Sequence, residues 1–231
     1  SNSTPSAADC PAMPPEGIAR RLAAEFLGSL LLATAVIGSG IMAERLSGGN
    51  TAVALIANTG ATVAALFLLI TILGPISGAH FNPAVTLVMS LRGAVARLEA
   101  VYYALVQCLG CCAGAVLAHA MFTLPLLQSG SQARTGSGQW LGESVASFGL
   151  LLVILGARRA ADVPWLVAAW IGGAYWFTSS TSFANPAITI GRSLSDTFAG
   201  IRPADAPAFI AAQFAGALLA LLIARALFRE D

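Results

Sequence analysis

The chain has 231 residues, of which 57% are hydrophobic and 10% are charged, and its formal net charge is +1. Soluble domains carry about 25% charged residues, so this composition excludes an ordinary water-soluble domain. The small net charge also argues against a nucleic-acid partner. Because a bilayer span needs about 20 mainly apolar residues and several windows meet that length, the composition predicts a protein whose main partner is membrane lipid.

The order of polar and apolar segments predicts one membrane domain after a short tail. Residues 1–17 are polar and proline-rich, and they lack the charged start and apolar stretch of a signal peptide. We therefore expect a flexible tail at 1–17 and a single membrane domain at 18–231. The six expected spans lie near 18–43, 51–74, 97–122, 139–159, 163–181 and 204–228. Two further apolar pieces, about 83–91 and 186–191, are too short to cross a bilayer and are expected to be re-entrant.

The two halves of the chain resemble each other. Three polar residues recur in the same order, and they pair as Glu25 with Glu143, Asn82 with Asn185, and Gln107 with Gln213. We therefore divide the domain into repeat one, about 18–122, and repeat two, about 139–228. Because each repeat has three spans, the second must enter the membrane inverted relative to the first. Inverted repeats place a shared site at their interface near the middle of the membrane.

Arginine supplies every basic charge, and its distribution predicts the orientation in the membrane. With both termini in the cytoplasm, the cytoplasmic side holds Arg20, Arg21, Arg92, Arg97, Arg158, Arg159, Arg225 and Arg229. The other side holds Arg45, Arg134, Arg192 and Arg202. This excess on one side follows the positive-inside bias, so we expect cytoplasmic termini.

The triplet Asn-Pro-Ala occurs twice, as Asn82, Pro83 and Ala84 and again as Asn185, Pro186 and Ala187. Asn is a preferred N-cap and Pro is favoured at the first helical position, so each triplet predicts the start of a short helix. A pair in inverted halves predicts two half-helices that meet head to head with their positive dipole ends facing each other. Each Asn amide is then expected to donate to water or a hydroxyl solute, while cations are repelled.

The stretches SGAHFNPAVT and SFANPAIT, with the opening AEFLGS, resemble the aquaporin and aquaglyceroporin family, also called major intrinsic proteins, over about residues 18–228. This resemblance implies an all-α membrane fold of six transmembrane helices and two re-entrant half-helices. It also implies a homotetramer with one pore per chain, and a channel that is no enzyme and has no cofactor. The residues agree, because the sequence shows no nucleophile–base pair near the midplane and no metal-ligand set.

Five polar residues in or beside the apolar segments are candidates for a role at the pore: Glu25, Glu143, Gln107, Gln213 and His80. Ionisable residues inside a membrane suggest function, and a proton relay through the two carboxylates is one interpretation. The favoured one is that they accept backbone N–H groups from the loops before the half-helices, because those donors need partners in lipid. His80 is expected to brace its loop, with pH sensing at the pore mouth as the alternative.

In the resembled family, four positions form a constriction on the outer side of the triplets, and an Arg directly follows the second triplet. Counted without gaps from the triplets, these positions here are Thr62, Gly173, Ser182 and Ile188, with Thr181 or Phe183 as the alternatives to Ser182. Ile188 in place of Arg removes a fixed positive charge and several N–H donors. Thr62 and Gly173 are smaller than the residues that the family has there. We therefore expect a wide, neutral and partly apolar constriction.

Bacterial members of the family that lack this Arg, with a turn similar to AERLSGGN, resemble the branch associated with arsenic-resistance genes. That resemblance implies a passive channel of the bacterial inner membrane for neutral trivalent metalloid acids, namely arsenite, antimonite and methylarsenite. Arsenite near neutral pH is a neutral trihydroxide, so it mimics a polyol. A generic glycerol and water channel, a secondary transporter and a membrane junction protein remain open alternatives.

Two other features have open interpretations. Cys108, Cys111 and Cys112 fall in one apolar segment, where residues 108 and 112 share a helix face. Buried Cys usually acts as a small hydrophobe, and contact with a soft metal or metalloid is the alternative. The loop at 123–138 is rich in Gly, Ser and Gln, and it is a candidate cover for the outer mouth.

Overall fold

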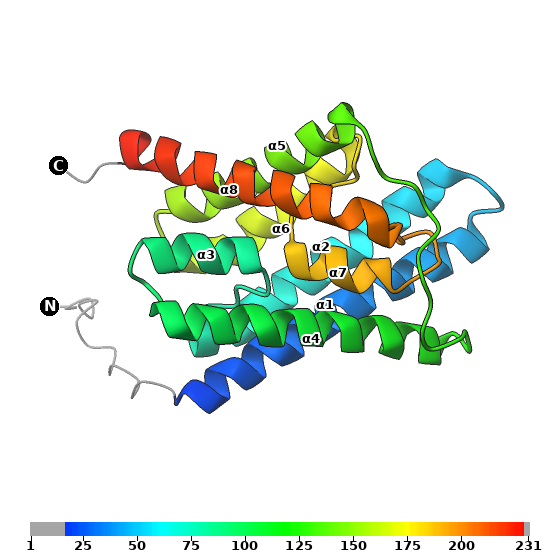
Figure 1. Ribbon diagram of the computed structural model, residues 1–231, viewed down its shortest axis with the longest axis horizontal. Helices are drawn as coiled ribbons and strands as arrows, with labels where there is room; N and C mark the ends of the chain where they lie inside the picture. Colours follow the sequence, from blue (N-terminus) through cyan, green and yellow to red (C-terminus); the bar gives the residue numbers. More distant parts are fainter. Residues whose placement is uncertain (1–16, 229–231) are drawn as a thin grey trace, which may run out of the picture.

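The computed structural model describes residues 17–228, which form eight α-helices and two short 3-10 turns (Figure 1). In chain order the elements are α1 (Ile18–Leu46), α2 (Thr51–Ser77), α3 (Pro83–Leu91), α4 (Arg97–Met121), α5 (Ser137–Gly156), η2 (Ala160–Asp162), α6 (Val163–Phe177), α7 (Pro186–Ser193), η3 (Pro203–Asp205) and α8 (Ala206–Leu227). Of the tail expected at 1–17, only Gly17 is among the described residues, and Cys10 and Arg229 lie outside them.

The helices reproduce the expected all-α membrane fold. Within residues 17–228, α1, α2, α4, α5 and α8 are long and apolar enough to cross a membrane. The sixth expected span is α6, which has only 15 residues because the backbone becomes extended at Thr178. The two half-helices are α3, with 9 residues, and α7, with 8. The expected boundaries agree with the observed ones to within a few residues because apolar runs, caps and prolines mark them.

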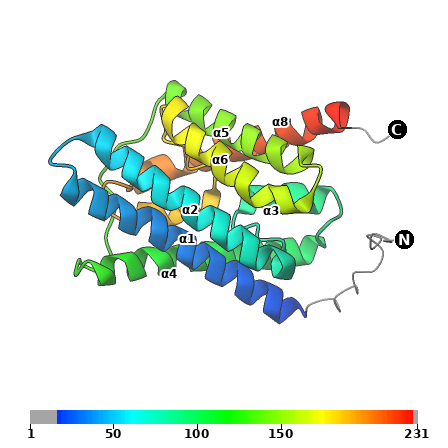
Figure 2. The same ribbon diagram turned by 180° about the vertical axis from the view of Figure 1, so that it is seen from behind.

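The two repeats pack as two similar groups. The most extensive contacts in repeat one join α1 to α4 and α2, and those in repeat two join α5 to α8 and α6. Between the repeats, α2 contacts α6, while both half-helices contact α4 and α8. Figure 1 shows α3 and α7 between α4 and α8, and Figure 2 shows α2 beside α6 on the opposite side. The half-helices therefore meet at the interface of the repeats.

The bundle has two distinct ends, visible in both views. We call the end where α1 begins and α8 finishes the terminal end. The opposite end carries the connections 47–50, 122–136 and 194–202, and we call it the loop end. Each half-helix starts near the middle of the bundle, and α7 runs from there toward the loop end (Figure 1).

Glycine allows a close helix crossing in each repeat. A Cβ added to Gly110 of α4 would lie 2.5 Å from the carbonyl oxygen of Phe26 in α1. A Cβ added to Gly216 of α8 would lie 2.1 Å from that of Ser144 in α5. Small residues at such crossings are typical of membrane helices, whose backbones approach closely. Both repeats thus use a glycine at the crossing of their first and last long helices.

Replacing Gly110 by Ala is expected to destabilise the protein by about 1–3 kcal/mol, because the added methyl group overlaps the Phe26 carbonyl. The measurement is the midpoint temperature of unfolding in detergent, which should fall by several degrees. Gly60→Ala in α2 is the matched control, since a Cβ at Gly60 meets no atom within 4 Å. Equal midpoints for the two variants would contradict this account of the crossing.

Candidate functional site

The Asn of each Asn-Pro-Ala triplet caps its own half-helix. Asn82 Oδ1 accepts a hydrogen bond from the backbone N–H of Ala84 at 2.9 Å. Asn185 Oδ1 accepts one from the backbone N–H of Ala187, also at 2.9 Å. The proline after each Asn occupies the first helical position, where its missing N–H leaves no donor unpaired. Both half-helices therefore begin in the same way, and both begin in the middle of the bundle.

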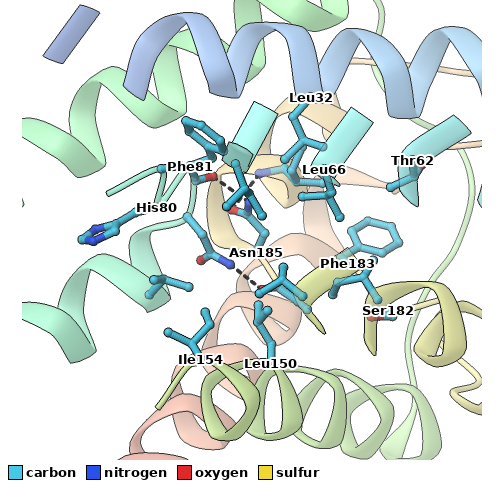
Figure 3. A pocket seen from close by; sticks show the side chains of 18 of the residues that line it. Leu32, Thr62, Leu66, His80, Phe81, Leu150, Ile154, Ser182, Phe183 and Asn185 are labelled. Atoms are coloured by element: carbon cyan, nitrogen blue, oxygen red, sulfur yellow. Dashed lines mark hydrogen bonds between the residues drawn. The ribbon is translucent and has the colours of Figure 1, made fainter. Parts of the chain in front are cut away.

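The same two Asn side chains also join the repeats. Asn82 Nδ2 donates to the carbonyl oxygen of Ala184 at 2.7 Å, and Asn185 Nδ2 donates to that of Phe81 at 2.8 Å (Figure 3). An amide nitrogen carries two N–H groups, so each Asn keeps one beyond this bond. One amide donor of each Asn thus bonds to the opposite loop, whereas the sequence predicts that these donors serve the pore alone.

Glu25 and Glu143 hold the loops that lead into the half-helices. Each carboxylate is fully buried and accepts two consecutive backbone N–H groups of one loop. The bonds run from His80 and Phe81 to Glu25, at 2.9 and 2.7 Å, and from Phe183 and Ala184 to Glu143, at 2.8 and 2.9 Å. An unsatisfied backbone group at membrane depth costs several kcal/mol. By accepting these N–H groups, each carboxylate holds its loop in place, and we call this arrangement a loop brace.

A glutamine and a threonine complete each brace. Gln107 Nε2 donates to Glu25 at 2.7 Å and to Thr86 Oγ1 of α3 at 2.9 Å. The partners in repeat two are arranged alike, since Gln213 Nε2 donates to Glu143 at 2.6 Å and to Thr189 Oγ1 of α7 at 2.9 Å. Each glutamine therefore links a carboxylate, which holds the loop, to the half-helix that follows the loop.

The braced loops have an unusual backbone. Positive φ values occur at Ala79 and Phe81 in the first loop and at the equivalent Ser182 and Ala184 in the second, all between 49° and 51°. A non-glycine residue in this region costs about 1–3 kcal/mol and persists only where its surroundings impose it. The buried carboxylates supply that constraint.

His80 contacts both its half-helix and a cavity. Its Nδ1 atom lies 3.1 Å from Thr86 Oγ1, and its ring meets the ring of Tyr103 edge-on, with centroids 5.5 Å apart. The side chain lines the cavity at the end opposite Thr62 and Ser182 (Figure 3). His80 is equivalent to Phe183 of the second loop, since each stands two residues before the Asn of its triplet.

A cavity of about 280 Å³ passes the two Asn residues. In Figure 3, His80 and Ile154 lie toward one end of it, Thr62 and Ser182 toward the other, and Asn185 between them. Its walls are mainly aliphatic and include Leu32, Val36, Leu66, Ile70, Leu150 and Val167. Polar groups are therefore confined to a stripe formed by the two loops, the triplets and a few side chains near the loop end.

Three of the four residues expected at the constriction line this cavity: Thr62, Ser182 and Ile188. Gly173 does not, because it is exposed on the outer face of α6. The α6 residues that line the cavity follow at intervals of four, namely Val163, Val167, Ile171 and Tyr175, and a residue two positions from Tyr175 points to the other side of a helix. Tyr175 therefore stands beside Thr62, with their hydroxyl oxygens 3.3 Å apart. A phenol is much larger than glycine, so the α6 side chain in this part of the cavity is bulkier than expected.

Arg192 is a second departure from the sequence expectation. It lies one turn after Ile188 on α7, lines the cavity and is only 3% exposed. Its Cζ atom lies 3.3 Å from the centroid of the Phe183 ring, and its Nε donates to the carbonyl oxygen of Ala199. The cavity therefore holds a positive charge despite the aliphatic side chain at 188. The spacing of four residues in a predicted helix is the signal that could have revealed it.

The segment 122–136 binds the connection that follows α7. Ser131 donates from its backbone N and its Oγ to Asp196 Oδ1, at 2.9 and 2.6 Å, and these bonds hold the pKa of the Asp196 carboxyl below its ordinary value. Arg134 donates from Nε to the carbonyl oxygen of Gly200 at 2.8 Å. The segment thus lies across the loop end and places a second guanidinium there.

The cysteines of α4 lie away from the cavity. Cys108, Cys111 and Cys112 are free thiols, and none of them lines it. Cys111 is fully buried, with its Sγ 3.7 Å from the carbonyl oxygen of Ser29 in α1. Across residues 17–228 there is no cluster of three or more His, Cys, Asp or Glu side chains that could hold a metal ion. Cys111 belongs to the hydrophobic core of the bundle, and Cys108 packs against that core.

Comparisons with known proteins point to one family. A sequence model of the major intrinsic protein family matches residues 15–172. The chain is 53% identical over 210 residues to the aquaglyceroporin AqpS of Rhizobium meliloti, covering 90% of each chain. It is 30% identical over 196 residues to the probable aquaporin TIP1-1 of Oryza sativa, covering 77% of this chain and 76% of that one. The solved aquaglyceroporin of Plasmodium falciparum shares the fold, with a TM-score of 0.69 at 18% identity, over 92% of this chain and 97% of that one.

Replacing Glu143 by Gln is expected to destabilise the protein by about 1–3 kcal/mol. The Gln amide has only one oxygen, so one of the two loop N–H groups loses its acceptor and meets an NH₂ group instead. The midpoint of unfolding in detergent should fall, while solute flux in vesicles keeps its dependence on pH. Glu44→Gln is the control, because Glu44 is exposed at the loop end. A variant of unchanged stability whose flux loses its pH dependence would favour the proton-relay interpretation instead.

Proposed function

This chain belongs to the major intrinsic protein family of membrane channels, and on that premise we propose that it conducts small uncharged solutes bearing hydroxyl groups. The proposed solutes are trivalent metalloid acids, namely arsenite, antimonite and methylarsenite, together with polyols such as glycerol and some water. The protein is a multi-pass membrane channel and not an enzyme. Transport is passive, so solutes move down their own concentration gradients.

The observation that carries this proposal is the aliphatic side chain of Ile188 in a cavity with one polar stripe. Ile188 is 4% exposed and lines the cavity opposite walls that are themselves mainly aliphatic. A solute with several hydroxyl groups bonds to the stripe while its remaining surface contacts the apolar wall. Arsenite and glycerol each carry three hydroxyl groups and no charge. The name of the Rhizobium relative, an aquaglyceroporin, supports a solute larger than water.

The two half-helices support exclusion of ions. Both α3 and α7 begin at the Asn pair, so their positive dipole ends face the same point of the cavity. A cation at that point meets two positive ends in a region of low dielectric, which is a barrier known from other pores. A water molecule that accepts N–H groups from both Asn side chains directs its hydrogens outward, which interrupts a chain of proton transfer.

A water and glycerol channel without preference for metalloids is the second candidate. Tyr175 favours it, because a phenol beside Thr62 narrows the constriction. A coupled transporter has less support, since no Asp or Glu of the described chain lines the cavity. A carrier of that kind typically needs an ionisable site near the break in its helices.

We propose a homotetramer with one pore per chain, placed in a bacterial inner membrane with both termini in the cytoplasm. Large apolar side chains on the outer helix faces, such as Leu68 and Ile72, are suited to lipid or to neighbouring copies. The bacterial relative supports the setting, and the excess of arginine at the terminal end supports the orientation.

Permeability of reconstituted vesicles to water, glycerol and arsenite, measured side by side, tests the proposed solutes. Ile188→Arg is expected to reduce arsenite and glycerol flux about tenfold more than water flux, a difference of about 1.4 kcal/mol in barrier height, because a guanidinium there narrows the path. Ile188→Leu is the control of similar volume. Strong glycerol flux with little arsenite flux in the unmodified protein would leave the second candidate in place.

A further inference from the structure

One charge in the cavity has an incomplete set of partners. Arg192 Nη1 is buried and has no hydrogen-bond partner, although the whole side chain is only 3% exposed. Burying a polar or charged group without partners costs free energy, so this N–H needs an oxygen from water or a solute. Arg192 is among the residues that line the cavity, so an oxygen atom of water or solute there is the candidate partner.

The guanidinium of Arg192 is fixed in place. Its Cζ atom lies 3.3 Å from the Phe183 ring centroid, and its Nε donates to the carbonyl oxygen of Ala199. A cation over an aromatic face is attracted by the ring quadrupole. Arg134 from the segment 122–136 approaches the same ring, with its Cζ 5.2 Å from the centroid. Two positive charges are therefore held beside one aromatic ring at the loop end.

Other polar atoms lie in the same part of the cavity. Ser182 Oγ is buried and has no partner, and Ser182 lines the cavity. The hydroxyl groups of Thr62 and Tyr175 form a pair 3.3 Å apart, and both residues line it as well. With Arg192 Nη1, these groups offer a fixed N–H donor and three hydroxyl groups that donate or accept. Such a set matches a neutral solute with several oxygens.

We propose that Arg192 is a specificity-determining residue of this channel, displaced by one helical turn from Ile188. Its charge excludes cations, and its free Nη1–H holds one oxygen of a neutral hydroxyl solute. The inference rests on the proposed function and extends it, because it places two successive selective positions, called steps here, along the constriction. A charged step at Arg192 faces the loop end, and an aliphatic step at Ile188 faces the Asn pair.

Two substitutions in reconstituted protein separate the charge from the donor. Arg192→Met removes both, whereas Arg192→Gln removes the charge and keeps N–H donors. Both are expected to raise vesicle permeability to methylammonium, by roughly a hundredfold for a charge about 6 Å from the path at an effective dielectric constant of about 20. Glycerol flux is expected to fall about tenfold with Met and much less with Gln, since only Met removes the hydrogen bond.

Arg45→Met is the matched control. The Arg45 guanidinium also lies over an aromatic ring at the loop end, 5.1 Å from the centroid of Phe122, but it is exposed and does not line the cavity. This variant is expected to exclude methylammonium as the unmodified protein does. Combining Ile188→Arg with Arg192→Met should restore exclusion, because a charge one turn away replaces the lost one.

The outcomes distinguish this inference from the proposed function. If an Arg192 variant conducts water normally and still excludes methylammonium, the inference is overturned. If Arg192→Met is inactive because it misfolds, Arg192→Gln and the double variant decide, and exclusion unchanged in Arg192→Gln likewise overturns it. If the unmodified protein conducts neither glycerol nor arsenite above the lipid background, the proposed function fails, whereas a methylammonium leak in the variants still supports the role of the charge.

Discussion

The structure depends on pairing the backbone N–H groups of two loops that lie at membrane depth. Lipid offers these donors no partner, and Glu25 and Glu143 provide one by accepting two loop N–H groups each. The bonds hold non-glycine residues at positive φ, which places both Asn residues at the same point of the cavity. The carboxylates thus act on permeation through backbone geometry, although no Asp or Glu of residues 17–228 lines the cavity itself.

Helix packing and loop geometry support each other. Gly110 lets α4 approach α1 closely enough for Gln107, one turn earlier, to reach Glu25. Gly216 does the same for α8 and α5, so that Gln213 reaches Glu143. A substitution at either crossing would therefore disturb the hydrogen bonds that hold the loop as well as the packing of the helices. Residues that are equivalent in the two repeats thus form equivalent hydrogen bonds.

Features encoded by local pattern could be predicted from the sequence, whereas features set by contacts between segments could not. Apolar runs gave the spans, and the Asn-Pro pairs gave the starts of α3 and α7. Counting residues across a loop failed, because the face of α6 is set by its packing, and it selected Gly173 where Tyr175 faces the cavity. The place of Arg192 in the cavity was not predicted because it lies one helical turn beyond the triplet motif. The positions of Arg134 and of the segment 122–136 depend on contacts with distant segments, such as the Gly200 carbonyl.

The reciprocal bonds of the Asn pair limit where this channel can open and close. Asn82 and Asn185 are each tied to the loop of the other repeat, so neither half-helix moves without breaking bonds in both. These bonds make the two half-helix starts rigid, so the middle of the path is a poor place for a gate. A gate is better placed at one of the two ends of the path, beside His80 at the terminal end or under the segment 122–136 at the loop end. A side chain that moves there leaves the hydrogen bonds of the Asn pair intact.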